Sequence, residues 1–277
     1  MSDASKAPVG DRYVLPTGTD DAVRLDVIHS VYGPASLRAL EAAAVATATR
    51  AADIGCGTGT VTRWMAAEMG SSGQVVGIDI APEQVEVARA TAPSAGSAAI
   101  TYQTGSAYET GLPDASFDVV FCRLVLCHLQ DPAKAVAQMA RLLRPGGRLV
   151  LVDMDLRDTF TMPACPSYQA YINECVIPYE TKIGVDYSVG RRLPQLMLDA
   201  GLRPDHVRVE QPTFQSGPEK HLWEKTWTFA LRRAVPEGVV TMERGMALIA
   251  AMEAHTASPE VWVAVAKIFA AVGTRRD

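Results

Sequence analysis

Residues 51–60 of the chain read Ala-Ala-Asp-Ile-Gly-Cys-Gly-Thr-Gly-Thr, and this stretch decides the fold. A short apolar run enters it, three glycines turn it, and residues 61–67 leave it with the composition of a helix. Glycine adopts positive φ and lets the backbone approach a ligand closely. A helix start offers unpaired N–H groups and a positive dipole end, which suit an anion such as a carboxylate or phosphate. The stretch therefore predicts a strand, a loop and a helix that together hold a cofactor.

The glycine spacing differs from that of the dinucleotide fingerprint, G-x-G-x-x-G. The third glycine, Gly59, comes one residue early, and Thr60 stands at the position of the fingerprint glycine. An acid, Asp53, lies two residues before the first glycine, Gly55. The motif is thus Asp-x-Gly-x-Gly-x-Gly, and its assignment depends on the motifs further along the chain.

Length and composition limit the classes of protein. The 277 residues suit one α/β domain with additions or two small domains, and 48% hydrophobic residues can form a large core. The net charge of −5 argues against nucleic acid or an anionic membrane as a partner. The five cysteines are odd in number and lack paired C-x-x-C spacing, which indicates reduced thiols. With no long apolar run and no apolar core near Met1, we expect a soluble, cytoplasmic protein.

Strands and helices alternate after the glycine stretch. We expect helices at 82–90 and 132–143, and strands at 74–79, 100–103, 117–122, 148–153 and 206–210. This alternation predicts a doubly wound α/β fold with a mostly parallel sheet. Further helices are expected at 191–200, 220–233 and 239–255. Residues 260–272 allow a strand or a helix, and their valine, tryptophan and phenylalanine favour a final strand.

The two flanks of this core carry no motif. Near the N-terminus, valines at helical spacing predict a helix at 22–31, which Gly33-Pro34 ends, and a second helix at 37–47. These helices form either an extra layer or a cap over the site. Residues 154–190 are rich in proline and tyrosine and come after the fifth strand, at the ligand-binding end of such a sheet. We divide the chain into a leader and helical cap (1–49), a cofactor-binding core (50–153), a substrate lid (154–190) and a C-terminal completion of the sheet (191–277).

Several residues at strand ends are candidates for cofactor binding. Asp79 ends its strand 20 positions after Gly59 (79 − 59), near the spacing of an acid that binds ribose hydroxyls. Its alternative role is to cap the helix that starts at Pro82, and the two roles are compatible. Ile80 can provide an apolar face for a nucleobase such as adenine. Ser106 and Ala107 come after the third strand, where the edge of that base would fall.

The fourth strand leads to a second group of candidates. The backbone of Cys122 can meet an ammonium group, and Arg123 can face a cofactor carboxylate, the substrate or a surface acid. His128 is a candidate base, or else a packing or capping residue. Tyr13, in the turn-rich approach to the first helix, reaches the cofactor or packs on the surface.

These motifs occur together in a recognisable order. Asp-Ile-Gly-Cys-Gly-Thr-Gly, Gly-Ile-Asp, Gly-Ser-Ala, Ser-Phe-Asp-Val-Val and Leu-Leu-Arg-Pro-Gly-Gly resemble the class I S-adenosylmethionine-dependent methyltransferases over about residues 50–155. The small-molecule group is the most similar, including ubiquinone and menaquinone biosynthetic enzymes and, less specifically, actinobacterial natural-product enzymes. Ser106 departs from the acid that is common at its position, which weakens the contact expected with the adenine amino group.

The resemblance implies a Rossmann-like, seven-stranded sheet and S-adenosylmethionine as cofactor. Its binding residues would be Tyr13, Asp53, Gly55, Cys56, Gly57, Thr58, Gly59, Asp79, Ile80, Ser106, Ala107, Cys122 and Arg123. For catalysis we name His128 and Tyr187, and for substrate binding Tyr171, Glu174, Asp186 and Tyr187. Each of the polar residues in 154–190 has a structural role as its alternative.

The implied reaction is methyl transfer to the oxygen or carbon of a small, largely apolar metabolite. Two alternatives stay open: a cyclisation or rearrangement that keeps the cofactor intact, and a non-catalytic regulatory protein that binds it. No His, Asp or Glu spacing typical of a metal site occurs, so we expect no metal. We expect a small-molecule partner, no nucleic acid, and possible homodimers.

Overall fold

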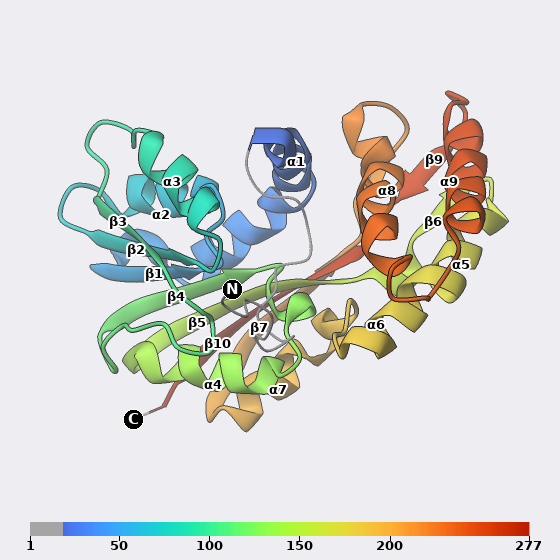
Figure 1. Cartoon of the computed structure of the whole chain (residues 1–277). Helices are drawn as coiled ribbons and strands as arrows, with labels where there is room; N and C mark the ends of the chain where they lie inside the picture. Colours follow the sequence, from blue (N-terminus) through green and yellow to red (C-terminus); the bar gives the residue numbers. More distant parts are fainter. Residues whose placement is uncertain (1–18, 277) are drawn as a thin grey trace, which may run out of the picture.

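The computed structural model describes residues 19–276, and the side chains from residue 24 onward. Tyr13, predicted from the sequence to reach the cofactor, lies outside these residues. The described chain folds into a main sheet flanked by helices, with a smaller helical lobe beside it (Figure 1).

The main sheet has seven strands in the order β3-β2-β1-β4-β5-β10-β7. The first five strands along the chain run parallel, and β10 runs antiparallel between β5 and β7. This confirms the mostly parallel seven-stranded fold. The strands are β1 (Arg50–Ile54), β2 (Gln74–Asp79), β3 (Ala99–Thr104), β4 (Phe117–Arg123), β5 (Leu143–Asp155), β7 (Leu202–Glu210) and β10 (Lys267–Arg275).

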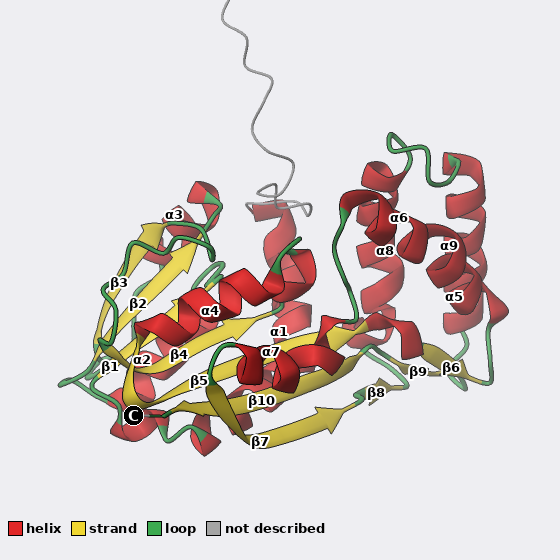
Figure 2. Ribbon diagram, turned by 90° about the horizontal axis from the view of Figure 1, so that it is seen from below, coloured by secondary structure: helices red, strands yellow, loops and turns green. Residues whose placement is uncertain are grey.

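Helices cover both faces of this sheet. On one face lie α1 (Thr19–Ala42), α2 (Thr60–Met69) and α3 (Pro82–Ala90), and on the other lie α4 (Pro132–Leu142) and α7 (Leu193–Asp199) (Figures 1 and 2). Burial on both faces explains why the central strands read as apolar runs. In β1, for example, Ala51, Ala52 and Ile54 are buried.

The N-terminal helical cap is present, but its division into two helices was wrong. Residues 19–42 form the single helix α1, which contains Pro34, and a short 3₁₀ helix, η2 (Val45–Thr47), comes next. A proline inside a helix costs about 3 kcal/mol. Tertiary packing outweighs that cost here, because Tyr32 and Leu40 on either side of Pro34 are fully buried. The Tyr32 hydroxyl also donates to the backbone oxygen of Ala266, at 3.3 Å.

The segment 154–190 forms one wall of the helical lobe. It contains η4 (Leu156–Asp158), β6 (Phe160–Met162), α5 (Pro166–Tyr171), the π-helical turn η5 (Ile172–Val176) and α6 (Ile177–Ile183). Pro178 cannot donate the hydrogen bond of a regular helix, and the π turn lies directly before it. The short helix η6 (Val189–Arg192) then returns the chain to the main sheet.

The opposite wall of the lobe comes from the C-terminal part of the chain. It contains η7 (Pro218–His221), α8 (Leu222–Ala234) and α9 (Met242–Thr256), together with the strands β8 (Thr213–Phe214) and β9 (Trp262–Ala264), which form a small sheet with β6. Residues 260–272 are therefore extended, as favoured, but they divide between β9 in the small sheet and β10 in the main one. The backbone amide of Val265, between the two strands, donates to the Pro212 oxygen.

We predict that Gly190→Ala lowers the free energy of unfolding by about 1–3 kcal/mol, because overpacking against rigid backbone is destabilising. An added Cβ would lie 2.7 Å from the Asp153 oxygen and 2.8 Å from the Met154 oxygen, both on β5. Urea unfolding monitored by circular dichroism measures the change. Ala95→Val, in an exposed loop, is the control. Equal stability of Gly190→Ala and wild type would contradict the close packing of η6 on β5.

Candidate active site

A cavity of about 240 Å³ lies at the carboxyl ends of β1, β2 and β4. The order of strands along the chain reverses between β1 and β4, which is where open α/β sheets bind ligands. The cavity continues from the glycine loop to the helical lobe, where α5, η5, α6 and α8 contribute to its walls. Helix α1 lines its side with Arg24, Leu25, Ile28, His29 and Tyr32.

The glycine loop needs its glycines for conformation and for space. Gly55, Gly57 and Gly59 have φ of 77°, 52° and 79°, in the left-handed region that favours glycine. A Cβ on Gly55 would also lie 2.1 Å from a methyl group of Val125. Gly55, Cys56, Gly57 and Thr58 line the cavity, while Gly59 forms the N-cap of α2.

Asp79 fixes the loop to the end of β2. One carboxylate oxygen, Oδ2, accepts a hydrogen bond from the Gly57 amide at 2.7 Å, and Oδ1 accepts from the Ala81 amide at 3.0 Å. Ala81, rather than Asp79, is the N-cap residue of α3. Burial raises the pKa of Asp79, and the hydrogen bonds from these amides oppose that shift. The carboxylate therefore both organises the loop and lines the cavity.

Beyond Asp79 the end of the cavity is lined by both apolar and polar side chains. Ile80, Ser106 and Ala107 line it, as does Gln84, which was not predicted from the sequence. The Ser106 hydroxyl accepts from the Tyr108 amide at 3.2 Å. Gln84 is 3% exposed, and its side-chain oxygen has no hydrogen-bond partner among the described residues. The sequence signal that could have found Gln84 is its position in the first helical turn after Pro82, close to the expected cofactor acid Asp79.

Two of the proposed cofactor residues lie behind the cavity wall. Asp53 is buried in β1 and accepts from the Thr62 hydroxyl at 2.6 Å. Burial raises its pKa to about 6, which the Thr62 hydrogen bond and the charge of Arg123 partly oppose. Cys122 is buried in β4 and does not line the cavity. Both residues thus support the wall from inside the sheet.

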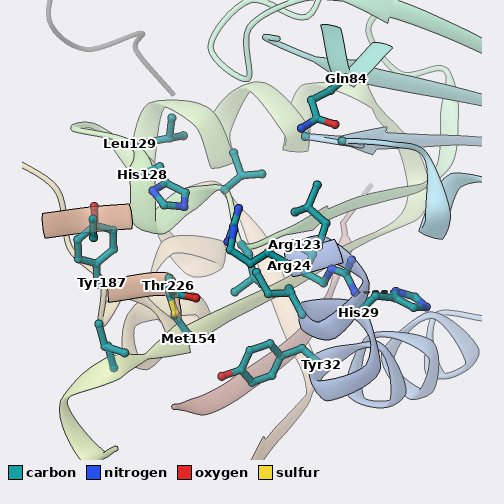
Figure 3. A pocket seen from close by; sticks show the side chains of 18 of the residues that line it. Arg24, His29, Tyr32, Gln84, Arg123, His128, Leu129, Met154, Tyr187 and Thr226 are labelled. Carbon is teal, nitrogen blue, oxygen red and sulfur yellow. Dashed lines mark hydrogen bonds between the residues drawn. The ribbon is translucent and has the colours of Figure 1, made fainter. Parts of the chain in front are cut away.

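Arg123 ends β4 and faces the cavity (Figure 3). Its guanidinium donates to Nδ1 of His29 at 3.3 Å. Burial lowers the pKa of Arg123 to about 10, and the nearby Asp53 charge opposes the shift. The pKa of His29 is lowered, first by burial and then by Arg123, so its ring is neutral and accepts this hydrogen bond.

His128 and Tyr187 meet at the other end of the cavity, between the sheet and the lobe. Their ring centroids lie 5.6 Å apart, with the rings edge to face (Figure 3). Burial, and next the charge of Arg24, lower the pKa of His128 to about 4. The imidazole is therefore neutral near pH 7. The Tyr187 amide donates to Glu180, which holds the residue at the cavity edge.

Of the remaining substrate candidates, only Tyr171 lines the cavity. Its ring stacks on Trp227 at 4.7 Å between centroids, and its hydroxyl donates to the Trp227 oxygen. Glu174 pairs on the surface with Arg244 at 2.8 Å, and Asp186 accepts from the Ser188 amide and pairs with Arg192. Neither acid is a cavity residue, so the structure brings Tyr171 and Tyr187 together without them.

The walls from α1 and α8 were not found from the sequence. Arg24, His29 and Tyr32 come from α1, and Trp223, Thr226 and Trp227 come from α8. The two tryptophans stand four residues apart on a helix that the sequence does predict, which places them on one face. No sequence pattern indicated that this face of the helix and the glycine loop line the same cavity.

Comparison with known proteins identifies the family. Residues 52–151 match the family model described as a methyltransferase domain. The chain is 31% identical over 163 residues to demethylmenaquinone methyltransferase of Deinococcus radiodurans, covering 55% of this chain and 67% of that protein. It is 30% identical over 174 residues to methyltransferase GfsG of Streptomyces halstedii, covering 57% and 62% of the two chains.

A solved structure of a Bacillus halodurans protein assigned as a methyltransferase shares the fold. Its TM-score is 0.61 at 16% identity, and the match covers 87% of this chain and 98% of that one. The chain spans 42–62% of the length of three curated relatives that it matches, GfsG among them. The fold, the glycine loop and these matches define a class I, S-adenosylmethionine-dependent methyltransferase. The chain belongs to that family.

The residues present fit S-adenosylmethionine. The left-handed glycine loop leaves room for a ligand close to the backbone, Asp79 can accept from two vicinal ribose hydroxyls, and Gln84 has an unused acceptor oxygen at the end suited to adenine. Across residues 24–276, no group of three or more His, Cys, Asp or Glu side chains is placed to hold a metal. No helix within residues 19–276 is long and apolar enough to cross a membrane.

We predict that Asp79→Asn weakens the binding of S-adenosylhomocysteine by about 1.5–3 kcal/mol, the range for hydrogen bonds to a charged group. The amide keeps the size of the side chain but loses the charge and one acceptor oxygen. Calorimetry measures the affinity, and Asp114→Asn, which changes an exposed carboxylate outside the cavity, is the control. An unchanged affinity in a folded Asp79→Asn protein would remove Asp79 from the cofactor site.

Proposed function

We propose that this protein transfers the methyl group of S-adenosylmethionine to an oxygen or carbon atom of a small, largely apolar acceptor. One observation carries the proposal: the glycine loop with Asp79 and an aromatic-walled chamber belong to the same cavity. A cofactor bound at the loop would share this space with its acceptor.

The chamber is the part of the cavity lined by Tyr171, Cys175, Tyr179, Leu222, Trp223 and Trp227. Trp227 packs on Tyr171 and on Trp223, with ring centroids 4.7 Å and 5.8 Å apart. Such walls favour a flat or aromatic acceptor, since aromatic side chains combine a large apolar area with preferred ring geometry. The acceptor named by the Deinococcus relative, demethylmenaquinone, is of this apolar class.

The bound cofactor supplies an electrophilic methyl group. What this chain contributes is the placement of the acceptor in line with the bond that breaks, because proximity and orientation lower the barrier of a two-reactant step. The chamber walls exclude water from the acceptor. In this proposal, segment 154–190 acts as the lid over it, contributing Tyr171, Tyr179 and Tyr187.

His128 is the proposed base for an acceptor that must lose a proton. Its ring lines the cavity and is neutral near pH 7, so a ring nitrogen can accept a proton as the new bond forms. Tyr187, edge to face with His128, would orient the acceptor oxygen through its hydroxyl. A carbon acceptor that is already anionic would need only the orientation.

Isotope transfer tests the proposal directly. Protein incubated with S-adenosylmethionine labelled in the methyl group, and with a panel of phenols, hydroquinones and enolisable diketones, should release S-adenosylhomocysteine and a labelled product. Conversion of an acceptor while the cofactor stays intact would instead indicate a cyclisation or rearrangement. Tight cofactor binding with no acceptor converted across the panel would favour a regulatory role.

We predict that Tyr187→Phe lowers kcat/KM for the acceptor by about tenfold or more, because it removes one hydrogen-bonding hydroxyl from the cavity and keeps the ring. The affinity for S-adenosylhomocysteine should change by less than about twofold, since the loop and Asp79 hold the cofactor. Steady-state kinetics and calorimetry measure the two quantities. Turnover equal to that of wild type would rule out the polar role of Tyr187.

We also predict how the rate depends on pH. The pKa of a neutral base limits the rate on the acid side, and the His128 pKa of about 4 lies below its ordinary value of 6.5. The kcat/KM of wild type should therefore show no acidic limb between about pH 5.5 and 7.5. A limb near 6.5 that is present in wild type and absent in His128→Asn would contradict the neutral, buried imidazole.

Cytoplasmic location remains part of the proposal. All five cysteines are free thiols, as expected in a reducing compartment. Homodimer formation stays a prediction from the sequence.

A further inference from the structure

The adenine amino group of the cofactor is a hydrogen-bond donor, and a buried donor needs an acceptor. Asp79 is the only carboxylate among the described residues that line the cavity, and its two oxygens already accept from the amides of Gly57 and Ala81. Ser106 stands at the position where an acid is common in the family. With Asp79 on the ribose, the acceptor for the amino group has to be an uncharged oxygen.

Two side chains with an uncharged oxygen line this end of the cavity, Ser106 and Gln84. The Ser106 hydroxyl accepts from the Tyr108 amide at 3.2 Å, which uses one of its two lone pairs. The side-chain oxygen of Gln84 is buried and accepts no hydrogen bond from any described residue. Both lone pairs of the Gln84 oxygen are therefore free for a ligand.

Helix α3 holds Gln84 in place beside the acid expected to bind ribose. Pro82 lies at the start of the helix, and the backbone amide of Gln84 donates to the Ala81 oxygen at 3.1 Å. The Ala81 amide in turn donates to Asp79, which joins the helix start to that acid. Figure 3 shows Gln84 at the end of the cavity away from Tyr187. An unpaired buried oxygen costs free energy, and a donor on a bound ligand offsets that cost.

We propose that the side-chain amide of Gln84 recognises the adenine amino group of the cofactor, in the role that an acid has at the position of Ser106 elsewhere in the family. The Gln84 oxygen accepts from the amino group, and the amide nitrogen remains able to donate to a ring nitrogen of the base. Glutamine pairs with adenine through one donor and one acceptor in protein–DNA contacts as well. The proposal concerns cofactor recognition and does not depend on which acceptor is methylated.

Two pairs of ligands test the proposal by equilibrium binding, without turnover. The first pair is S-adenosylhomocysteine and its 6-deamino analogue, in which purine replaces adenine. The second pair is S-adenosylhomocysteine and its 2′-deoxy analogue, which reports on the ribose. Calorimetry measures both affinity ratios in wild type, Gln84→Met, Gln84→Glu, Ser106→Ala and the control Gln195→Met, which changes an exposed glutamine of α7. Because each ratio compares two ligands in one protein, a general loss of affinity cancels.

Wild type should bind S-adenosylhomocysteine about 5- to 10-fold more tightly than the deamino analogue, the contribution of one hydrogen bond. Gln84→Met should reduce this ratio to less than about twofold, because methionine is of similar length but offers only a weak sulfur acceptor. Gln84→Glu should keep the ratio at or above that of wild type, because a carboxylate still accepts. Ser106→Ala and Gln195→Met should match wild type, and the 2′-deoxy ratio should be the same in all five proteins.

Other results would overturn the proposal. Equal binding of the amino and deamino ligands by wild type would show that no acceptor recognises the amino group. A preference that survives in Gln84→Met would assign the amino group to another acceptor, and its loss in Ser106→Ala would identify Ser106 as that acceptor. Loss of the preference in Gln84→Glu would assign the contact to the amide nitrogen. A fall of the 2′-deoxy ratio in Gln84→Met would place Gln84 on the ribose.

These outcomes are separate from those of the methyl-transfer assay. Recognition of the amino group by Gln84 in a protein that methylates no acceptor would leave this proposal standing and remove the proposed activity. Methyl transfer by a protein whose preference for the amino group survives in Gln84→Met would do the reverse.

Discussion

The hydrogen bond from the Gly57 amide to the Asp79 carboxylate is the contact on which the site depends. It joins the loop after β1 to the end of β2, and it requires a left-handed backbone that only the glycines adopt without strain. The Gly55 and Cys56 amides donate to the Ile78 oxygen and close the same junction. The backbone geometry of the glycine loop thus defines the cofactor end of the cavity. The other end is defined by its side chains.

That other end is assembled from distant parts of the chain. Helix α1 contributes Arg24, the loop after β4 contributes His128, segment 154–190 contributes Tyr187, and α8 contributes Trp227. Burial and the charge of Arg24 keep the His128 imidazole neutral. A chamber with aromatic walls and a neutral imidazole beside it suits the small, largely apolar acceptor that we propose. In this proposal the fold fixes the donor, and the lobe selects the acceptor.

Local sequence signals were sufficient for the core and insufficient for the lobe. The glycine loop, Asp79 and the alternating strands could be predicted because each depends on neighbouring residues and on the strand period. Pro34 was wrongly predicted to end the first helix. The free-energy cost of a proline inside a helix can be expected from the sequence alone, but the burial of Tyr32 and Leu40 that offsets this cost depends on contacts with distant parts of the chain. Likewise, Glu174 looked like a site residue but pairs with Arg244 on the surface. Only the packing of α1 beside the main sheet shows that Arg24 lines the cavity.

The crystal structure of the protein with S-adenosylhomocysteine tests the central claim most directly. We expect the ribose hydroxyls to donate hydrogen bonds to Asp79. We expect the sulfur atom to face the aromatic chamber, close to His128 and Tyr187. A ribose bound away from Asp79, or a sulfur atom walled off from the chamber, would contradict that claim.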